Sequence, residues 1–314
     1  MRPFLLKPAI KDYIWGGTKL REEFGRKSSK ERLAESWELS CHPDGESIIA
    51  SGEYMGMKLS EFIRLHPEAV GRDFSSDDKF PILVKLIDAK DDLSIQVHPD
   101  NEYAAVHEND SGKTEMWYII EADEGAELVY GFREELTKEQ FRNAVENNTI
   151  MDKVKRVAVK AGDVFLIQPG TLHAIGKGIL LAEIQQSSNV TYRVYDYGRL
   201  GIDGKPRELH IEKALDVTNT QPSETYQGFE PFSTHGHIVH HLAKCQYFHV
   251  IKFDIFSELQ GINGFAHALF IGGNGCVECD EGCIQVSKGS SVFIPHGVKN
   301  CKITGKCSVI ITTV

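Results

Sequence analysis

The stretch GDVFLIQPGTLHAIG (residues 162–176) has the pattern of a β-hairpin: a glycine, a short apolar run, a Pro-Gly turn, and then His173 three residues after the turn glycine. The pattern recurs in GSSVFIPHGVKNCKI (289–303), and aligning the turn glycines places Asn300 opposite His173. A unit that is used twice predicts two related β-barrels. Because His173 can bind a metal through its imidazole whereas Asn300 offers an amide, we predict one active barrel and one that is kept for structure.

Strand-like runs dominate the chain, and turn residues separate them at the spacing of an all-β sandwich or barrel. Helical patterns interrupt the strands at 58–71, 100–109 and 136–148. In the last of these, Thr137 is the expected N-cap and Gln140 lies at the capping-box spacing. We predict strand-rich stretches at 81–88, 93–97, 115–122, 126–132, 154–160, 163–168 and 178–186, and in a second block at 247–255, 267–279, 283–297 and 306–314.

A polar segment with Pro and Gly, NTQPSETYQGFEPFSTHGH (219–237), separates the two blocks and is typical of a linker. The chain length of 314 residues suggests about two domains. We therefore predict a metal-binding catalytic domain with helical inserts at 1–232 and a degenerate second barrel domain at 233–314.

The composition narrows the possible partners. The formal net charge of −10 argues against a nucleic-acid surface, but a local pocket of Lys and Arg can still hold a small anionic ligand. No signal peptide or membrane span is visible, so we expect no membrane partner. Seven cysteines without a spacing pattern fit a reducing compartment, and we predict a cytoplasmic protein whose oligomeric state stays open.

Four residues form a candidate metal site. In LSIQVHPD (93–100), Gln96 and His98 lie two apart and therefore point to the same side of a strand. The alternative is a solvated strand face that happens to carry a histidine. Glu115 opens the next strand and His173 follows the Pro-Gly turn, and antiparallel neighbours bring such residues together at a barrel mouth. This ligand set suits Zn²⁺, with Mn²⁺ or Fe²⁺ also compatible.

Six motifs follow one another along nearly the whole chain: YIWGG (13–17), AESWELSCHP (34–43), QVHP (96–99), KTEM (113–116), PGTLHA (169–174) and EIQQSSNVTYR (183–193). In combination they resemble the type I mannose-6-phosphate isomerases, a zinc-dependent cupin family, and the compact length is similar to its short bacterial branch. The resemblance implies a mainly β fold of two cupin-type (jelly-roll) β-barrel units with helical insertions. It also implies one zinc ion per chain, held by Gln96, His98, Glu115 and His173.

The family reaction interconverts mannose 6-phosphate and fructose 6-phosphate by moving a proton between C1 and C2 through a cis-enediol(ate), so the implied partner is a phosphorylated hexose. The family's active-site cations fall on Lys113 and Arg193, and which of them holds the phosphate stays open. Glu183 is the carboxylate that we prefer for proton transfer, because it would stay ionised beside zinc and an arginine.

Each of these residues has a structural alternative. Glu183 could be a carboxylate that only holds Arg193, and Lys113 could be a surface lysine before a strand. Trp15 and Trp37 are expected in the core or the pocket wall rather than stacked on substrate.

Three other functions remain possible at this stage. They are a cupin isomerase or epimerase of a different phosphorylated sugar, a non-catalytic sugar-binding or storage cupin, and an Fe²⁺ dioxygenase. The histidines of STHGHIVHH (233–241) are interpreted as a solvated loop because their alternation breaks. In CVECDEGC (276–283) we predict a hairpin with free thiols rather than a zinc knuckle.

Overall fold

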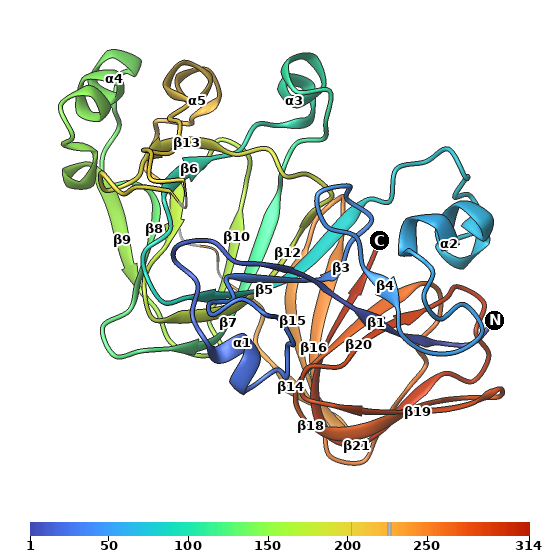
Figure 1. Cartoon of the computed structure of the whole chain (residues 1–314). Coiled ribbons are helices and arrows are strands. Elements are labelled where there is room, and N and C mark those ends of the chain that lie inside the picture. The colour runs from blue at the N-terminus through green and yellow to red at the C-terminus, as the bar shows by residue number, and fades with distance from the viewer. Residues whose placement is uncertain (202, 225, 227) are drawn as a thin grey trace.

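The computed structural model describes residues 1–314 except 202, 225 and 227, and the described part is mainly β, with three antiparallel sheets (Figure 1). The predicted mainly β class with helical insertions is therefore confirmed. None of the described helices is long and apolar enough to cross a membrane. The helices are α1 (Lys19–Glu22), α2 (Leu59–Leu65), α3 (Asn101–His107), α4 (Lys138–Glu146) and α5 (Ile211–Val217), with 3-10 turns at Pro67–Ala69 and Ile150–Asp152.

Two of the sheets face each other and form the site-bearing half of the molecule. The six-stranded sheet has the order β10 (Val164–Ile167), β7 (Glu115–Ala122), β12 (Ile179–Gln186), β5 (Ile82–Ala89), β3 (Glu35–Leu39) and β2 (Ala9–Lys11). The five-stranded sheet has the order β13 (Tyr192–Tyr195), β6 (Ile95–Val97), β11 (His173–Ile175), β8 (Glu127–Phe132) and β9 (Val154–Ala158). An apolar cluster with Trp117 and Leu181 from the first sheet and Leu128 and Ile175 from the second packs between them.

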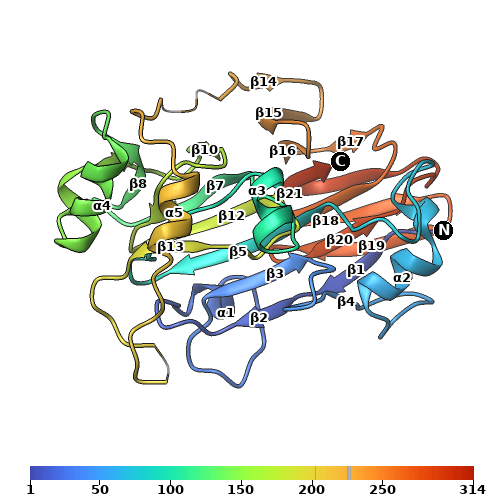
Figure 2. The ribbon, with the colours of Figure 1, turned by 90° about the horizontal axis from the view of Figure 1, so that it is seen from above.

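The six-stranded sheet is covered on both faces, as Figure 2 shows from above. Every residue of β12 and of β5 is buried. On β12, Leu181 packs toward the five-stranded sheet, whereas Leu180 and Ile184 join the cluster that packs against the ten-stranded sheet. Burial on both faces explains why these strands read as nearly continuous apolar runs rather than as alternating ones.

The ten-stranded sheet combines the C-terminal block with the start of the chain. Its path runs through β14 (Phe232–Ser233), β15 (His237–Lys244), β16 (His249–Ile255), β21 (Lys302–Thr313), β18 (Ala266–Cys279), β20 (Ser291–Ile294), β1 (Phe4–Lys7) and β4 (Ile48–Ile49), while β17 (Glu258–Gln260) pairs with β21 and β19 (Gly282–Ser287) with β18. Phe4 pairs with Phe293, and β4 pairs with the other edge of β1, so these two early strands complete a sheet that is otherwise built from the end of the chain. The domain boundary at 232/233 stays a prediction.

One segment differs from its predicted structure. The histidine-rich stretch was expected to be a solvated loop, and this is wrong for His237–Lys244, which is strand β15 between β14 and β16. Val239, Leu242 and Ala243 are buried and anchor the strand, whose register against β16 shifts between His241 and Ala243. The histidine alternation breaks at Val239, because this buried residue lies on the same strand face as His237 and His241. Part of the predicted linker, residues 225 and 227, lies outside the described residues.

The cysteine-rich segment folds as predicted. Cys279 pairs with Gly282 at the end of the β18–β19 hairpin, and all seven cysteines are free thiols.

Candidate active site and metal centre

Strand register places the site residues in two rows on the facing sheets. Across β3, β5, β12 and β7, the directly opposed residues are Trp37, Lys85, Glu183 and Trp117. Across β8, β11, β6 and β13, they are Tyr130, His173, Gln96 and Arg193. Opposed residues of neighbouring strands point to the same face of a sheet. Residues that are far apart in the chain therefore converge between the sheets.

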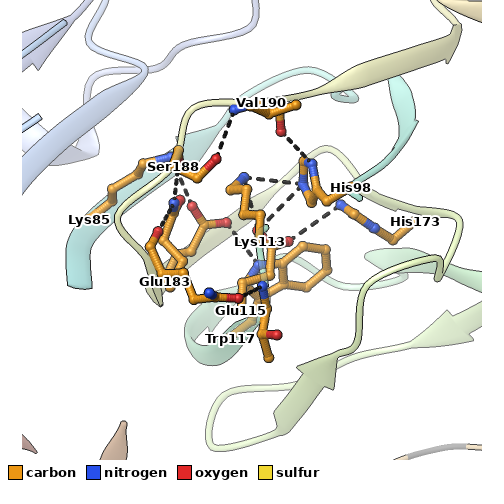
Figure 3. A network of polar contacts seen from close by, with 12 residues as sticks. Lys85, His98, Lys113, Glu115, Trp117, His173, Glu183, Ser188 and Val190 are labelled. Carbon is orange, nitrogen blue, oxygen red and sulfur yellow. Dashed lines mark hydrogen bonds and ion pairs between the residues drawn. The ribbon is translucent and has the colours of Figure 1, made fainter. Parts of the chain in front are cut away.

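The candidate metal ligands His98, Glu115 and His173 meet at one point, and one side-chain atom from each lies within 4.8 Å of the others (Figure 3). The Nε2 atom of His98 is 3.5 Å from Glu115 Oε2, and the Nε2 atom of His173 is 3.3 Å from Glu115 Oε1. All three side chains are buried. The sequence prediction that these three residues converge is confirmed, and the alternative of a solvated strand face is wrong for His98.

The orientation of both imidazoles is set by backbone carbonyls. The Nδ1 atom of His98 lies 2.8 Å from the Val190 carbonyl oxygen, and the Nδ1 atom of His173 lies 2.8 Å from that of Thr171. A carbonyl oxygen only accepts, so each Nδ1 carries the proton and each Nε2 presents a lone pair toward Glu115. This is the arrangement that holds histidine ligands in metal sites.

The donor set fits a metal ion. Within the described part of the chain, Glu115 Oε1 and His173 Nε2 are buried without a hydrogen-bond partner, whereas Glu115 Oε2 pairs with Lys113. Buried polar atoms that converge without a hydrogen bond are costly unless a further group satisfies them. Gln96 is the cross-strand partner of His173 and lines the adjoining cavity. Its place as a fourth ligand stays a prediction.

Lys113 lies on the Glu115 side of the site. Its Nζ atom is 2.9 Å from Glu115 Oε2, at ion-pair distance, and 3.1 Å from His98 Nε2. The side chain is buried, so the alternative of a surface lysine is wrong. The ammonium occupies the space between two of the candidate ligands, where it contributes positive charge in a dry site.

Glu183 does not hold Arg193, so that structural alternative is wrong. Its Oε1 atom lies 3.0 Å from Lys85 Nζ, and its Oε2 atom accepts a hydrogen bond of 2.9 Å from Trp117 Nε1. The Lys85 ammonium is also 3.8 Å from Glu35 Oε2. The sequence analysis did not single out Lys85, and the signal was a lysine between the apolar residues of PILVKLI (81–87).

The charges of the site shift the pKa values of Glu183 and Glu115 in opposite directions. Burial alone would raise the pKa of Glu183, but Lys85 and Lys113 outweigh it and hold that pKa below its ordinary value. Burial and the charge of Glu183 raise the pKa of Glu115 to about 7. Burial lowers the pKa of His173 to about 4. The His173 imidazole is therefore neutral near pH 7, the form that binds metals.

A cavity of about 290 Å³ opens beside the candidate metal centre. The predicted residues Gln96, Lys113, Glu183 and Arg193 all line it. Trp15 also lines the cavity and Trp37 is fully buried, as expected for a pocket wall and a core residue. Lining residues that the sequence did not single out include Tyr13, Glu35, Lys85, Ser94 and Arg207.

Comparison with known proteins decides the family. Residues 4–144 match the family model "Phosphomannose isomerase type I, catalytic domain", and residues 237–314 match "Mannose-6-phosphate isomerase, cupin domain". Mannose-6-phosphate isomerase ManA of Bacillus subtilis (strain 168) is 38% identical over 99% of this chain and 98% of its own length. The chain belongs to the type I phosphomannose isomerases. It is therefore an enzyme of the aldose–ketose isomerase class with a cupin domain, as the sequence motifs predicted.

Solved structures agree with this family. The crystal structure of the mannose 6-phosphate isomerase from Bacillus subtilis superposes with a TM-score of 0.95 at 36% identity and covers both chains completely. A structure described as mannose 6-phosphate isomerase (holo; zinc bound) has a TM-score of 0.80 at 16% identity over 100% of this chain and 99% of that one, and this likeness shows the shared fold.

Proposed function

We propose that this phosphomannose isomerase interconverts mannose 6-phosphate and fructose 6-phosphate, with zinc held by His98, Glu115, His173 and Gln96. The observation that carries the proposal is the convergence of two oriented imidazoles and a buried carboxylate beside a cavity that is lined by Lys113, the residue that contacts Glu115. The same cavity is lined by a carboxylate and two cations suited to sugar phosphate chemistry, Glu183, Lys113 and Arg193.

The ligand set suits a catalytic zinc rather than a structural one. Two neutral imidazoles, an amide and one carboxylate would leave a divalent ion with a net positive charge, unlike a thiolate-rich structural site. When bound, zinc supplies a Lewis acid that polarises a sugar oxygen. The relative that is described as zinc bound supports this metal.

Proton transfer falls to Glu183 in this proposal. The isomerisation needs a base that removes a proton from carbon and returns it to the neighbouring carbon. Glu183 is ionised at neutral pH, because Lys85 and Lys113 hold its pKa below the ordinary value. Its Oε2 atom is fixed by Trp117, which leaves the carboxylate in one orientation at the cavity wall.

Lys113 and Arg193 stabilise negative charge. As the proton leaves carbon, charge develops on the adjacent oxygen, and a preorganised cation in a dry site stabilises it most strongly. Lys113 is buried beside Glu115 and suits this role. Arg193 lies farther along the row, with its Nε atom donating to Ser94 Oγ at 3.2 Å and its Nη1 atom donating to the Glu208 carbonyl oxygen at 2.8 Å. It suits the phosphate end of the substrate.

A coupled assay tests the proposal. Fructose 6-phosphate formed from mannose 6-phosphate is measured before chelation, after chelation and after zinc is restored, with glucose 6-phosphate as the competing substrate. We expect turnover of mannose 6-phosphate that chelation abolishes and zinc restores. Equal or faster turnover of glucose 6-phosphate would favour an isomerase of another phosphorylated sugar. No turnover of either sugar by the zinc-loaded protein would favour a sugar-binding cupin and contradict the proposal.

A further inference from the structure

The segment after β13 folds back and completes the arginine end of the cavity. The backbone N–H of Arg193 donates to His210 Nδ1 at 3.2 Å, and the backbone N–H of His210 donates to the Arg193 carbonyl oxygen at 2.8 Å. Together with the Arg193–Glu208 hydrogen bond, these contacts fasten residues 207–210 to the strand that carries Arg193. Arg207 is thereby placed on the wall of the cavity that also contains Gln96.

Arg207 is held in place by one carboxylate. Its Nε atom donates to Asp196 Oδ2 at 2.7 Å and its Nη2 atom donates to Asp196 Oδ1. These are its hydrogen bonds among the described residues. Both N–H groups of Nη1 and the second N–H group of Nη2 therefore remain able to donate to a ligand. The side chain is 22% exposed, which is enough to meet a ligand in the cavity.

At the arginine end of the cavity, the arginine side chains outnumber the carboxylates that pair with them. Asp196 is shared between Arg207 and Arg199, and Arg193 has no carboxylate partner among its described hydrogen bonds. Burial and the nearby charge of Arg207 lower the pKa of Arg193. Two cations that face one small cavity repel each other unless an anion lies between them. Glu183 and Lys113 line the same cavity, and Lys113 contacts Glu115 of the candidate metal centre.

We propose that Arg207 binds the phosphate group of the substrate together with Arg193, and that Asp196 is the positioning residue that aims Arg207 into the cavity. The inference rests on the proposed function and extends it. A phosphate on C6 at the arginine end directs C1 and C2 of the hexose toward Glu183 and the metal centre. A guanidinium with free N–H groups suits phosphate oxygens, because it donates two parallel hydrogen bonds.

Arg199 offers a matched control. It also donates to Asp196 Oδ1, at 2.7 Å, but its Nη1 atom donates to the Asp92 carbonyl oxygen and it lines a different cavity, with Ile14 and Lys177. Arg199→Gln therefore removes one cation from the same carboxylate without removing a group from the substrate cavity.

The test compares Arg207→Gln, Arg207→Lys and Arg199→Gln with the zinc-loaded wild type. For Arg207→Gln we expect KM for mannose 6-phosphate to rise roughly 10- to 100-fold while kcat stays within about threefold, the pattern of a lost uniform binding contact. Arg207→Lys should recover part of this loss, and Arg199→Gln should leave KM within about twofold. Thermal unfolding of each variant verifies that it is folded.

Binding of mannitol 6-phosphate, which has no carbonyl group and is not isomerised, separates this inference from the catalytic proposal. Calorimetry should show tighter binding to wild type as pH rises through the phosphate pKa of about 6, and a weaker pH dependence for Arg207→Gln. If Arg207→Gln changes KM and this Kd by less than about twofold, or Arg199→Gln changes them equally, Arg207 is not a phosphate ligand, whether or not mannose 6-phosphate is turned over.

Discussion

Lys85 is buried between the carboxylates of Glu183 and Glu35. Burial would lower the pKa of its ammonium, but Glu183 and Glu35 outweigh this and raise that pKa above its ordinary value. The cation thereby keeps Glu183 ionised and fixed at the cavity wall. Lys85 therefore acts on the site indirectly, by keeping Glu183 charged and in position.

Lys85→Met should leave the buried carboxylates of Glu183 and Glu35 without the cation that pairs with them. Removing one partner of a buried ion pair costs roughly 3–5 kcal/mol, so we expect a large loss of unfolding free energy together with most of the activity. The double variant Lys85→Met/Glu183→Gln should recover stability but not activity. Denaturant unfolding and the coupled assay measure both quantities. A stability loss below ~1 kcal/mol in the single variant would show that the pair is not coupled.

Arg193→Lys keeps the positive charge but removes the planar guanidinium, which donates hydrogen bonds to Ser94 Oγ and to the Glu208 carbonyl oxygen. We expect the variant to retain zinc and fold while kcat/KM falls roughly 10²-fold or more, the scale for loss of one preorganised donor. A rise in KM alone would mean uniform phosphate binding, and equal falls in kcat and kcat/KM would mean a contact made in the transition state. Changes under about twofold in both parameters would place Arg193 outside the site.

The candidate ligands could be predicted at the residue level because period-two alternation and motif order identify them. His98, Glu115 and His173 converge as expected. Lys85 could not be placed in this way, because its importance depends on a partner that is far away in the chain. Arg207 could not be placed either, because only the return of residues 207–210 to β13 brings it to the cavity. Glu183 lies 98 residues after Lys85, and only strand register reveals that β5 and β12 are neighbours.

At the scale of elements, strand register is what assembles the site. A shift of β12 by one residue against β5 and β7 would turn Glu183 away from Lys85 and Trp117 and toward the ten-stranded sheet. The strand runs themselves were predicted well, because short apolar stretches between turn residues are a strong signal. Sheet order and the pairing of β1 with β20 were not predictable, since these contacts join opposite ends of the chain.

Helix α4 begins with the predicted capping box. Thr137 Oγ1 accepts from the Gln140 N–H at 3.1 Å, and Gln140 Oε1 accepts from the Thr137 N–H at 2.8 Å. Thr137→Ala should lower the unfolding free energy by about 1 kcal/mol, the typical value of an N-cap. Because the helix lies outside the cavity, kcat and KM should not change. A kinetic change without a stability change would mean that this insertion influences the site directly.

At the scale of the whole molecule, the ten-stranded sheet supports the site-bearing sheets through a buried polar link. His267 Nε2 lies 2.8 Å from Ser291 Oγ, which donates at 2.9 Å to the carbonyl oxygen of Glu38 on β3. Burial lowers the pKa of His267 to about 3. The unfolded chain therefore binds a proton at His267 below pH 6.5, its ordinary pKa, whereas the folded chain does not.

This difference predicts a pH dependence of stability. A depressed histidine pKa means that unfolding free energy is lost as pH falls from 6.5 toward 3, because protons favour the unfolded chain. Between pH 7 and pH 5, His267 alone should account for about 2 kcal/mol, and His267→Gln should show a loss that is smaller by this amount. Denaturant unfolding at both pH values measures it. Equal losses in wild type and variant would mean that His267 titrates normally when folded.

The central claim is that one zinc ion, held by His98, Glu115, His173 and Gln96, is required for isomerisation of mannose 6-phosphate. The most direct measurement is a titration of metal-depleted enzyme with zinc, in which bound metal and fructose 6-phosphate formation are followed together. We predict that activity rises linearly and stops at one equivalent per chain, and that His173→Ala neither binds that equivalent nor gains activity. Full activity without metal, or a His173→Ala variant with normal zinc content and normal turnover, would contradict the account.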